Sequence, residues 1–373
     1  GQTYDYVAWY DLIRRLAPDA VIAIKGPDVR WCGNEAGSTR PAEWSVVPIG
    51  GAPDDWTWPD MNAADLGSLA RIEAVLEDGG HLHWYPAEVN TSIRHGWFWR
   101  DERQHVKPAA EILDIWYRAV GGNTVFLLNV PPDRRGLFAD RDVAVLREVG
   151  ATLRQTFGRN LAVGATARAT GRRGPEFDPE HVVDGDVSTG WATGDWYESG
   201  HVVIDMPETR RFNRVVLQEM VRDFGQRIER FAVDGWIDGG WSEIATGTTV
   251  GAKRICRVAT IETDRVRVRI RDARVCPTLA EVGLYLEPVR LETPRVTRDR
   301  AGRVTIEGVA GTTIRYTVDG GDPDETARVF DAPFDLADGG TIRARAFDDR
   351  DGRRGPMTTQ SFDMAPIGWT IHD

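Results

Sequence analysis

The sequence contains little cysteine, very little lysine and no long apolar segment. Only three of its 373 residues are Cys, and they form neither a CxxC pair nor a Cys/His group at zinc-ligand spacing, so a zinc site is not expected. The longest apolar stretches, such as residues 124–130, are far shorter than the ~18 residues of a membrane-spanning helix. We expect no membrane span, and a single Cys256–Cys276 disulfide is compatible with this composition.

Negative charge exceeds positive charge, since 57 acidic and 46 basic residues give a formal net charge of −11. A nucleic-acid-binding protein needs a concentrated positive face, so no nucleic-acid partner is expected. The length predicts two or three domains. Nine of the 14 Trp lie in the first 116 residues. Indole faces suit the apolar C–H faces of sugars, although core packing accounts for most of these residues.

Residues 1–157 alternate between helical and strand patterns. Apolar residues at helical spacing predict four helices, over Tyr6–Leu16, Ala63–Leu76, Ala109–Val120 and Asp140–Phe157, the last with Asp140 as N-cap. Short apolar runs predict strands over Ala20–Ile24, His81–Tyr85 and Thr124–Val130. Because no hairpin turns separate them, the pattern predicts a parallel sheet in an α/β domain.

Beyond residue 157 the chain is predicted to be all β. Short β-branched strands are expected at His201–Asp205, Arg214–Gln218, Phe231–Trp236 and Val266–Ile270, and then at Arg303–Ile306, Thr313–Val318 and Thr341–Phe347. Pro288 and Pro294 mark a joint. We therefore predict a multidomain protein with an α/β domain (1–157), two β-sandwich domains (158–288 and 289–364) and a tail (365–373).

The segments that follow the three predicted strands of the first domain carry acidic, aromatic and basic residues. In parallel α/β folds such segments form the site. With the end of the third strand, they contain Asp28, Arg30, Trp31, Glu35, Glu88, Arg94, Trp97, Asn129 and Asp133. Glycoside hydrolysis requires two carboxyls flanking the anomeric carbon, and aromatic rings can hold the sugar. The pattern favours this chemistry, with helix caps and salt bridges as the alternative explanation.

Four segments in order, GPDVRWCGNEAG, AEWSVVP, SIRHGWFW and LLNVPPDRRG, resemble the α-L-fucosidases of glycoside hydrolase family 29, most closely the branch acting on α-1,3 and α-1,4 linkages. The resemblance implies that residues 1–157 are the second half of a (β/α)8-type barrel. It implies hydrolysis of terminal α-L-fucose with retention, with no cofactor. The acid/base would be Glu35, which we expect to be partly desolvated beside Trp31. Asn90 stands where the family usually has an acidic residue.

The resemblance also places the nucleophile, an Asp, upstream of this chain. We therefore expect the N-terminal half of the enzyme as a second chain or fragment, without which this chain is inactive. Arg30, Trp31, Trp97 and Phe98 are the expected substrate contacts, with a structural role as the alternative for Arg30 and Trp97. Glu43, Trp44, Glu88 and Arg94 are expected to give structural support. The alternative function is a non-catalytic carbohydrate-binding or adhesive fragment. The substrate class implies an extracellular or periplasmic location.

Residues 158–288 resemble the discoidin-like (F5/8 type C) modules of carbohydrate-binding family 32, on NLAVGATARAT, HVVDGDVSTGWAT and LAEVGLY. Asp184, Asp186 and Thr189 lie within six residues, and such hard oxygen donors suit Ca²⁺, with Glu281 closing the site. An Asx-turn cluster without an ion is the alternative. Trp196, Tyr197, Arg222 and Phe224 are candidates for a sugar site, although packing against the barrel is also compatible with this module. In the third domain, IRYTVDGGDP, APFDL and GGTIRARAF resemble the small β-sandwich of chitobiase-like enzymes.

Overall fold

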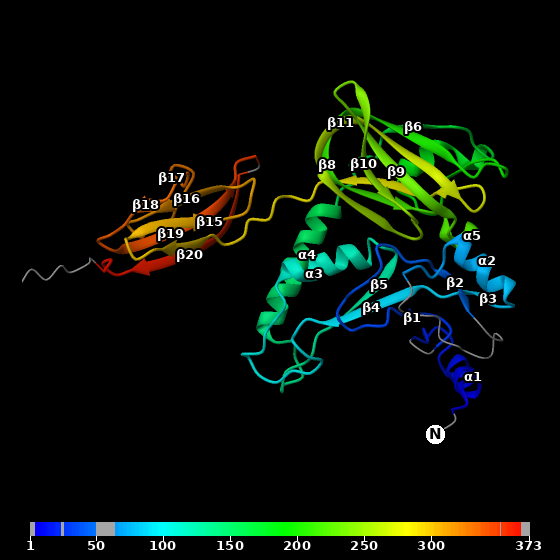
Figure 1. The fold of residues 1–373 in the computed structure, drawn as a ribbon, viewed down its shortest axis with the longest axis horizontal. Helices are drawn as coiled ribbons and strands as arrows, with labels where there is room; N and C mark the ends of the chain where they lie inside the picture. The colour runs from blue at the N-terminus through cyan, green and yellow to red at the C-terminus, as the bar shows by residue number, and fades with distance from the viewer. Residues whose placement is uncertain (1–3, 24–25, 50–63, 351, 367–373) are drawn as a thin grey trace, which may run out of the picture. The chain divides into compact units, whose positions relative to one another are not determined.

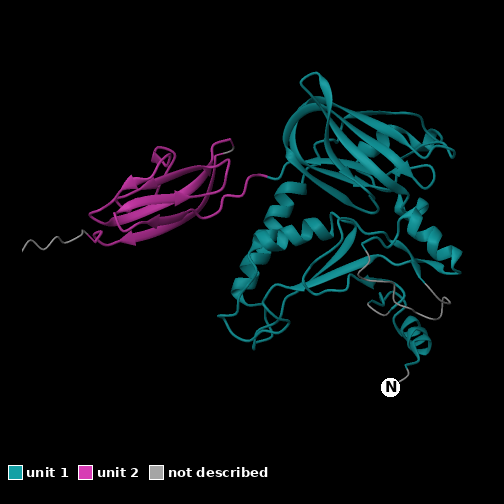
Figure 2. Ribbon diagram, in the orientation of Figure 1, with its two compact units in different colours: residues 1–287 teal, residues 288–373 magenta. Residues whose placement is uncertain are grey.

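A computed structural model describes residues 4–23, 26–49, 64–350 and 352–366 of the chain (Figure 1). The chain divides into two compact units, residues 1–287 and 288–373 (Figure 2). The first two predicted domains therefore fall within one unit, and the boundary lies at Pro288, which was predicted to mark a joint. Ile24 of the first predicted strand and residues 367–373 of the predicted tail lie outside the described residues.

The first part of unit 1 contains the helices that the apolar periodicity predicts. Their bounds are α1 Tyr6–Leu16, α2 Leu69–Glu77, α3 Ala109–Ala119 and α4 Asp140–Phe157. Helix α2 begins later than predicted, because Asp65 Oδ1 accepts the backbone N–H groups of Gly67 (3.1 Å) and Ser68 (3.0 Å) and holds a turn there. The predicted N-cap of α4 is also wrong, since Ala139 takes that position and Asp140 is the first helical residue.

Three parallel strands form the sheet of this part, in the order β1 Arg30–Trp31, β4 Ala87–Ser92 and β5 Thr124–Asn129. Strands β2 Val46–Ile49 and β3 His81–Trp84 form a separate antiparallel pair. Two predictions are therefore wrong. Segments β1 and β4 were expected to be loops, and β3 was expected in the parallel sheet. Strand β4 has the sequence AEVNTS, and because of its polar residues a search for apolar runs does not detect it.

The predicted strand Ala20–Ile24 is also not formed in its described residues. Ala23 makes a single parallel bridge to Val29, and Val21 is 67% exposed. A strand needs a ladder of backbone hydrogen bonds to a neighbour. Along the described residues, only that bridge is present for this segment.

Helices α3 and α4 cover one face of the parallel sheet. Phe126 and Leu128 of β5 pack into a cluster with Ile112 of α3 and Val145 of α4. Because side chains alternate along a strand, Val125 and Leu127 point to the opposite face, where each is 53% exposed. The uncovered face is therefore the one that carries Val125 and Leu127 of β5. Over the described residues, none of the helices is long and apolar enough to cross a membrane.

Residues 158–287 form mainly antiparallel sheet (Figure 1), with one large hydrophobic core and a smaller cluster around Phe177 and Met220. The elements are β6 Thr166–Ala169, η1 Pro175–Phe177, η2 Pro179–Val183, β7 Trp191–Ala192, β8 Gly200–Gln218, α5 Val221–Phe224, β9 Ile228–Ile237, β10 Gly240–Gly247, β11 Arg254–Ala273, β12 Thr278–Leu279 and β13 Glu281–Tyr285. The two short strands predicted within 201–218 are joined in the 19-residue β8, which pairs with β6 near its start and β13 at its end.

The Cys256–Cys276 disulfide that the composition allowed is not formed, because Cys32, Cys256 and Cys276 are all free and buried. Cys256 lies near the start of β11, and Cys276 lies beyond its end. An extended strand advances about 3.3 Å per residue, so the length of β11 separates the two thiols far beyond the ~7 Å Cα separation that a disulfide tolerates.

A buried polar network joins the parallel-sheet part of unit 1 to the antiparallel part. Asn123, in the left-handed region at φ 62°, donates from Nδ2 to Glu43 O (2.9 Å) and accepts from Ala252 N at Oδ1 (2.9 Å). Gln226 accepts from Ser45 N (2.8 Å) and donates to Glu43 O (3.2 Å). Because buried amides without partners are costly, this network fixes how the two parts of unit 1 pack.

Unit 2 is built from two small antiparallel sheets. The three-stranded sheet has the order β14 Arg295–Arg298, β15 Arg303–Glu307 and β18 Phe334–Asp335, and the four-stranded sheet has the order β17 Arg328–Val329, β16 Thr313–Thr317, β19 Gly340–Asp348 and β20 Arg353–Phe362. Val304 and Ile306 of one sheet share a core with Tyr316, Ile342 and Ala344 of the other.

Candidate active site

The candidate site lies at the C-terminal ends of β1, β4 and β5. Trp31 Nε1 donates to Asn90 Oδ1 at 3.3 Å across the β1–β4 pair. Asn129, the last residue of β5, donates from Nδ2 to Ser92 Oγ and to the backbone oxygen of Trp97, both at 3.0 Å. The ends of the parallel strands therefore meet at one edge, although of these three strands only β5 was predicted from the sequence.

The segment after β1 folds into a tight loop that presents Glu35. Gly33 (φ 83°) and Gly37 (φ 74°) both adopt the left-handed backbone that favours glycine. Asn34 Oδ1 accepts the N–H groups of Ala36 (3.0 Å) and Ser38 (3.1 Å) inside this turn. Asn34 has no role in the sequence analysis, although an Asn followed by small residues is a recognisable signal for an Asx turn.

Glu35 and Trp97 come together from two different loops. Glu35 Oε2 accepts from Trp97 Nε1 at 2.7 Å. The expected neighbour of Glu35 was Trp31, and the expected partial desolvation is not present, since Glu35 is exposed. The bond fixes the direction of the carboxyl, because an indole N–H donates in the plane of its ring. Phe98, the residue after Trp97, is 82% exposed.

Arg30 lies beneath this edge and does not reach the surface. It is 0% exposed, it forms an ion pair with Glu43 (2.7 Å), and it donates to the backbone oxygens of Tyr85 and Trp44, both at 3.0 Å. The expected contact of Arg30 with substrate is therefore contradicted, and its structural role is the correct alternative. The guanidinium is buried between β1 and residues 43–45, so it stabilises the core.

Arg94 is a second buried structural arginine. Its Nε donates to both oxygens of Asp142, at 3.0 and 2.9 Å, and both side chains are 0% exposed. Arg94 Nη1 also donates to Asp101 O at 3.1 Å, which ties the loop containing Trp97 to helix α4. Arg94 was expected to give structural support, but its partner Asp142 was not identified from the sequence, because it lies 48 residues away.

The other predicted acidic residues of this edge have different surroundings. Asp28 forms an ion pair with Arg14 and accepts from Ile22 N at 2.7 Å. Asp133 forms an ion pair with Arg135 at 2.7 Å. Glu88 is half-buried on β4, and burial raises the pKa of its carboxyl. Asp28 and Asp133 therefore stabilise the loops in which they lie.

The predicted calcium residues gather around one loop of the antiparallel part. Asp184 accepts from Asp186 N (2.8 Å) and from Thr189 Oγ1 (2.7 Å). Glu281 accepts from Gly185 N (3.3 Å) and from Asn160 Nδ2 (2.9 Å). Burial, and then the charges of Asp184 and Asp186, raise the pKa of Glu281 to about 7.

This oxygen cluster has the donor chemistry that Ca²⁺ prefers, but its side chains are bonded within the loop. Asp186 Oδ1 accepts from both the N–H (2.9 Å) and the hydroxyl (2.6 Å) of Ser188. Among the described residues, no group of three or more His, Cys, Asp or Glu side chains is arranged to hold a metal ion. As positioned here, the loop has the form of an Asx-turn cluster.

The candidate sugar-binding residues of this part separate into two groups. Trp196 and Tyr197 are 95% and 65% exposed on one loop. Phe224 instead packs against Phe177, with ring centroids 5.6 Å apart. Arg222 is exposed at the start of α5.

Comparison with known proteins places these parts in families. Residues 60–156 match the alpha-L-fucosidase family, residues 165–282 match the F5/8 type C domain, and residues 304–362 match the family described as Fn3 associated.

Individual relatives give the same assignment. The chain is 33% identical over 291 residues to alpha-L-fucosidase 1 of Arabidopsis thaliana, which covers 76% of this chain and 55% of that protein. A solved structure called SpGH29 is 30% identical with a TM-score of 0.67, covering 77% of this chain and 60% of that one. A Ruminococcus gnavus GH29 fucosidase in complex with fucose is 28% identical with a TM-score of 0.65, covering 77% and 58%. The chain spans about half the length of the curated relatives it matches. The chain therefore carries an alpha-L-fucosidase domain, an F5/8 type C domain and an Fn3-associated region, and the two solved structures named above are GH29 proteins.

Proposed function

We propose that this chain is part of an enzyme that hydrolyses terminal α-L-fucose from fucosylated glycans. The observation that carries the proposal is the exposed carboxyl of Glu35, held by Trp97 at the C-terminal edge of a parallel sheet. The fucosidase relatives support it, as does the fucose complex of the Ruminococcus gnavus enzyme. Half-buried Trp31 and Trp97 offer apolar surface to a sugar ring at this edge.

The mechanism that we propose is a double displacement with retention. Glu35 donates its proton to the glycosidic oxygen while an Asp outside this chain forms a bond to C1, and the aglycone leaves as an alcohol. Glu35 then takes a proton from water, whose oxygen displaces the Asp and releases fucose. The hydrogen bond from Trp97 holds one carboxyl oxygen and leaves the other for the proton.

The nucleophile and the rest of the barrel would come from a preceding segment, either in the same polypeptide or as a second chain. Relatives about twice as long support this proposal. So do Val125 and Leu127, which lie exposed on the sheet face opposite the helices. Closing a (β/α)8 barrel would bury that face and remove the open strand edge.

Glu35→Gln in the complete enzyme tests the role of the carboxyl. Activity on a natural fucoside should fall roughly 10²- to 10⁴-fold, the usual contribution of a general acid. The first step should be far less affected for an aryl fucoside with an acidic phenol, because that leaving group needs little protonation. Azide should then restore turnover, because an anionic nucleophile needs no base.

Glu307→Gln is the matched control, because it removes an exposed carboxylate that pairs with Arg295 in unit 2. It should retain full activity. Equal losses on both substrates for the Glu35 variant, without azide rescue, would exclude the acid/base role. Full activity of the variant on natural fucosides would exclude a catalytic role for Glu35, and lack of fucoside hydrolysis by the unmodified complete enzyme would exclude the proposed function.

A second function, carbohydrate binding by the F5/8 type C domain, is favoured by the exposure of Trp196 and Tyr197. Large exposed aromatic side chains on a loop are the surface on which sugars stack. Trp196→Ala should abolish retention on a fucosylated glycan array, whereas Trp241→Ala, on β10, should not. We also propose a structural Ca²⁺ at Asp184, Asp186, Thr189 and Glu281, and an extracellular or periplasmic location that suits the substrate.

A further inference from the structure

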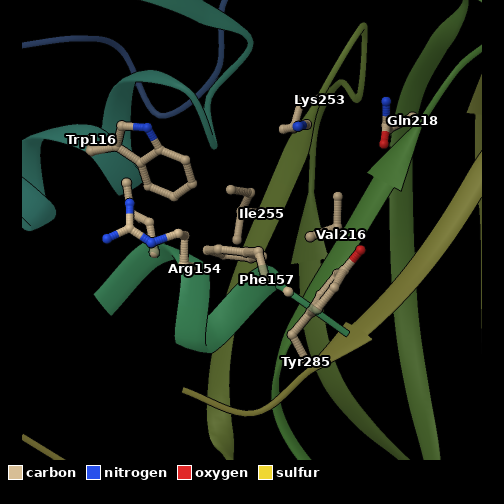
Figure 3. A pocket seen from close by; sticks show the side chains of 10 residues that line it. Trp116, Arg154, Phe157, Val216, Gln218, Lys253, Ile255 and Tyr285 are labelled. Carbon is tan, nitrogen blue, oxygen red and sulfur yellow. The ribbon is translucent and has the colours of Figure 1, made fainter. Parts of the chain in front are cut away.

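A cavity of about 610 Å³ lies within unit 1, away from the Glu35 loop (Figure 3). Helices α3 and α4 form one wall and the sheet of β8, β11 and β13 forms the other. Its lining residues are Trp116, Leu153, Arg154, Phe157, Gly158, Val216, Gln218, Lys253, Ile255 and Tyr285. The proposed fucosidase mechanism uses none of them.

Aromatic rings form much of the apolar surface of this cavity. The ring of Phe157 lies between those of Trp116 and Tyr285, with centroid distances of 5.4 and 5.1 Å. Val216 and Ile255 extend this surface on the sheet (Figure 3). The rings meet at tilted or edge angles, so they form a curved surface that can hold the C–H face of a sugar.

Polar side chains without protein partners complete the lining. In the part of the chain that the structure describes, no hydrogen bond or ion pair engages the side chains of Lys253, Arg154 or Gln218. Figure 3 shows Gln218, the last residue of β8, and Lys253, the residue before β11, on the sheet side of the cavity, with Arg154 on the helix side.

Neighbouring arginines of the same two strands are paired. Arg214 of β8 forms an ion pair with Glu287, and Arg257 of β11 pairs with Asp114 at 2.8 Å. Among the described residues that line the cavity, none is acidic. Its two cations therefore lack a counter-charge, in a chain whose net charge is −11.

We propose that this cavity binds an anionic saccharide, a sugar unit that carries a carboxylate or a sulfate. The anion would lie between Lys253 and Arg154, the amide of Gln218 would bond a hydroxyl, and the ring would rest on Trp116 and Tyr285. This site is separate from the proposed fucose site. It gives the protein a means of recognising acidic glycans independently of hydrolysis.

Binding of defined disaccharides to the full chain tests the proposal. Calorimetry and saturation-transfer NMR would compare a disaccharide ending in glucuronic acid, its 6-O-sulfated glucose counterpart and the neutral glucose form. At least one acidic form should bind about tenfold more tightly than the neutral form, the change expected for one charge-assisted hydrogen bond. The stronger of the two acidic forms identifies the anion.

Variants of the cavity provide the controls. Lys253→Met and Arg154→Gln should each weaken binding of the acidic form about tenfold, whereas Lys107→Met, which removes a paired lysine elsewhere, should have no effect. Glu35→Gln should also bind normally, which separates this proposal from the fucosidase function. Equal binding of acidic and neutral forms, binding unchanged in Lys253→Met, or no saturable binding of either acidic form would overturn the proposal.

Discussion

Replacing Asp142 with Asn should strongly destabilise the parallel-sheet part of the protein. Asp142 accepts two hydrogen bonds from Arg94 Nε, and neither side chain has exposed surface. Asn preserves the shape of Asp but removes its charge, so the guanidinium of Arg94 would remain buried without a counter-ion. Removing one partner of such a pair costs about 3–5 kcal/mol of unfolding free energy.

A double variant distinguishes the loss of the counter-charge from a simple packing defect. The double variant Arg94→Met/Asp142→Leu removes both charges and fills a similar volume with apolar atoms. Exchanges of this kind are often neutral or stabilising. The double variant should therefore regain most of the stability that Asp142→Asn loses, although the bond from Arg94 to Asp101 O is lost as well.

Urea unfolding followed by tryptophan fluorescence measures the effect. Nine of the 14 Trp lie in the first 116 residues, so the signal reports mainly on the part that contains the ion pair. The linear dependence of the unfolding free energy on urea gives the difference between variants. A change of less than about 0.5 kcal/mol for Asp142→Asn, the range of ordinary surface substitutions, would refute the reasoning.

Two further predictions concern buried acids of the F5/8 type C domain. Glu219 accepts the N–H groups of Arg227 (2.7 Å), Ile228 (3.0 Å) and Gly251 (2.6 Å), so Glu219→Gln turns an NH₂ group toward one of these donors and should cost about 1–3 kcal/mol in thermal or urea unfolding. The pKa of Glu281 is raised to about 7, so the folded state binds this proton more tightly than the unfolded state and stability in chelator should fall as pH rises from about 4.5 to 7. Burial raises the pKa of Glu219 to about 7 as well, so Glu281→Gln should reduce that slope and leave the share of Glu219, and Ca²⁺ should oppose the fall if the proposed ion is bound. A slope unchanged in Glu281→Gln would assign it to another group, and melting temperatures insensitive to Ca²⁺ would exclude the ion.

The helices could be predicted from the sequence because their signal is local. The apolar period of 3.6 residues gives α1 and α4 their observed bounds, and α3 to within one residue. Strand β5 is likewise a continuous apolar run. Strand β4 could not be found in this way, since every second residue faces the open side of the sheet and is polar. Its position depends on pairing with β1 and β5, which are distant in sequence.

The candidate site, like the fold, could be predicted where its signal is local and not where it depends on distant segments. Glu35 and Trp97 could be expected near each other, because both follow segments that end at one edge of a parallel sheet. The choice of Trp97 over Trp31 as the partner of Glu35 depends on the turn that Asn34 and two glycines impose. The burial of Arg30 could not be predicted, because it depends on Glu43 arriving from a later segment.

The amide network at Asn123 has a consequence for how this protein can be cut. Gln226 and Thr249 belong to the F5/8 type C domain, yet their bonds complete the surroundings of Ser45 and Asn123 in the fucosidase portion. Truncation near residue 158 would remove Gln226 and Thr249, and the polar groups of Ser45 and Asn123 would lose these partners. The F5/8 type C domain therefore stabilises the parallel-sheet part of unit 1, and any shortened form of that part should retain this domain.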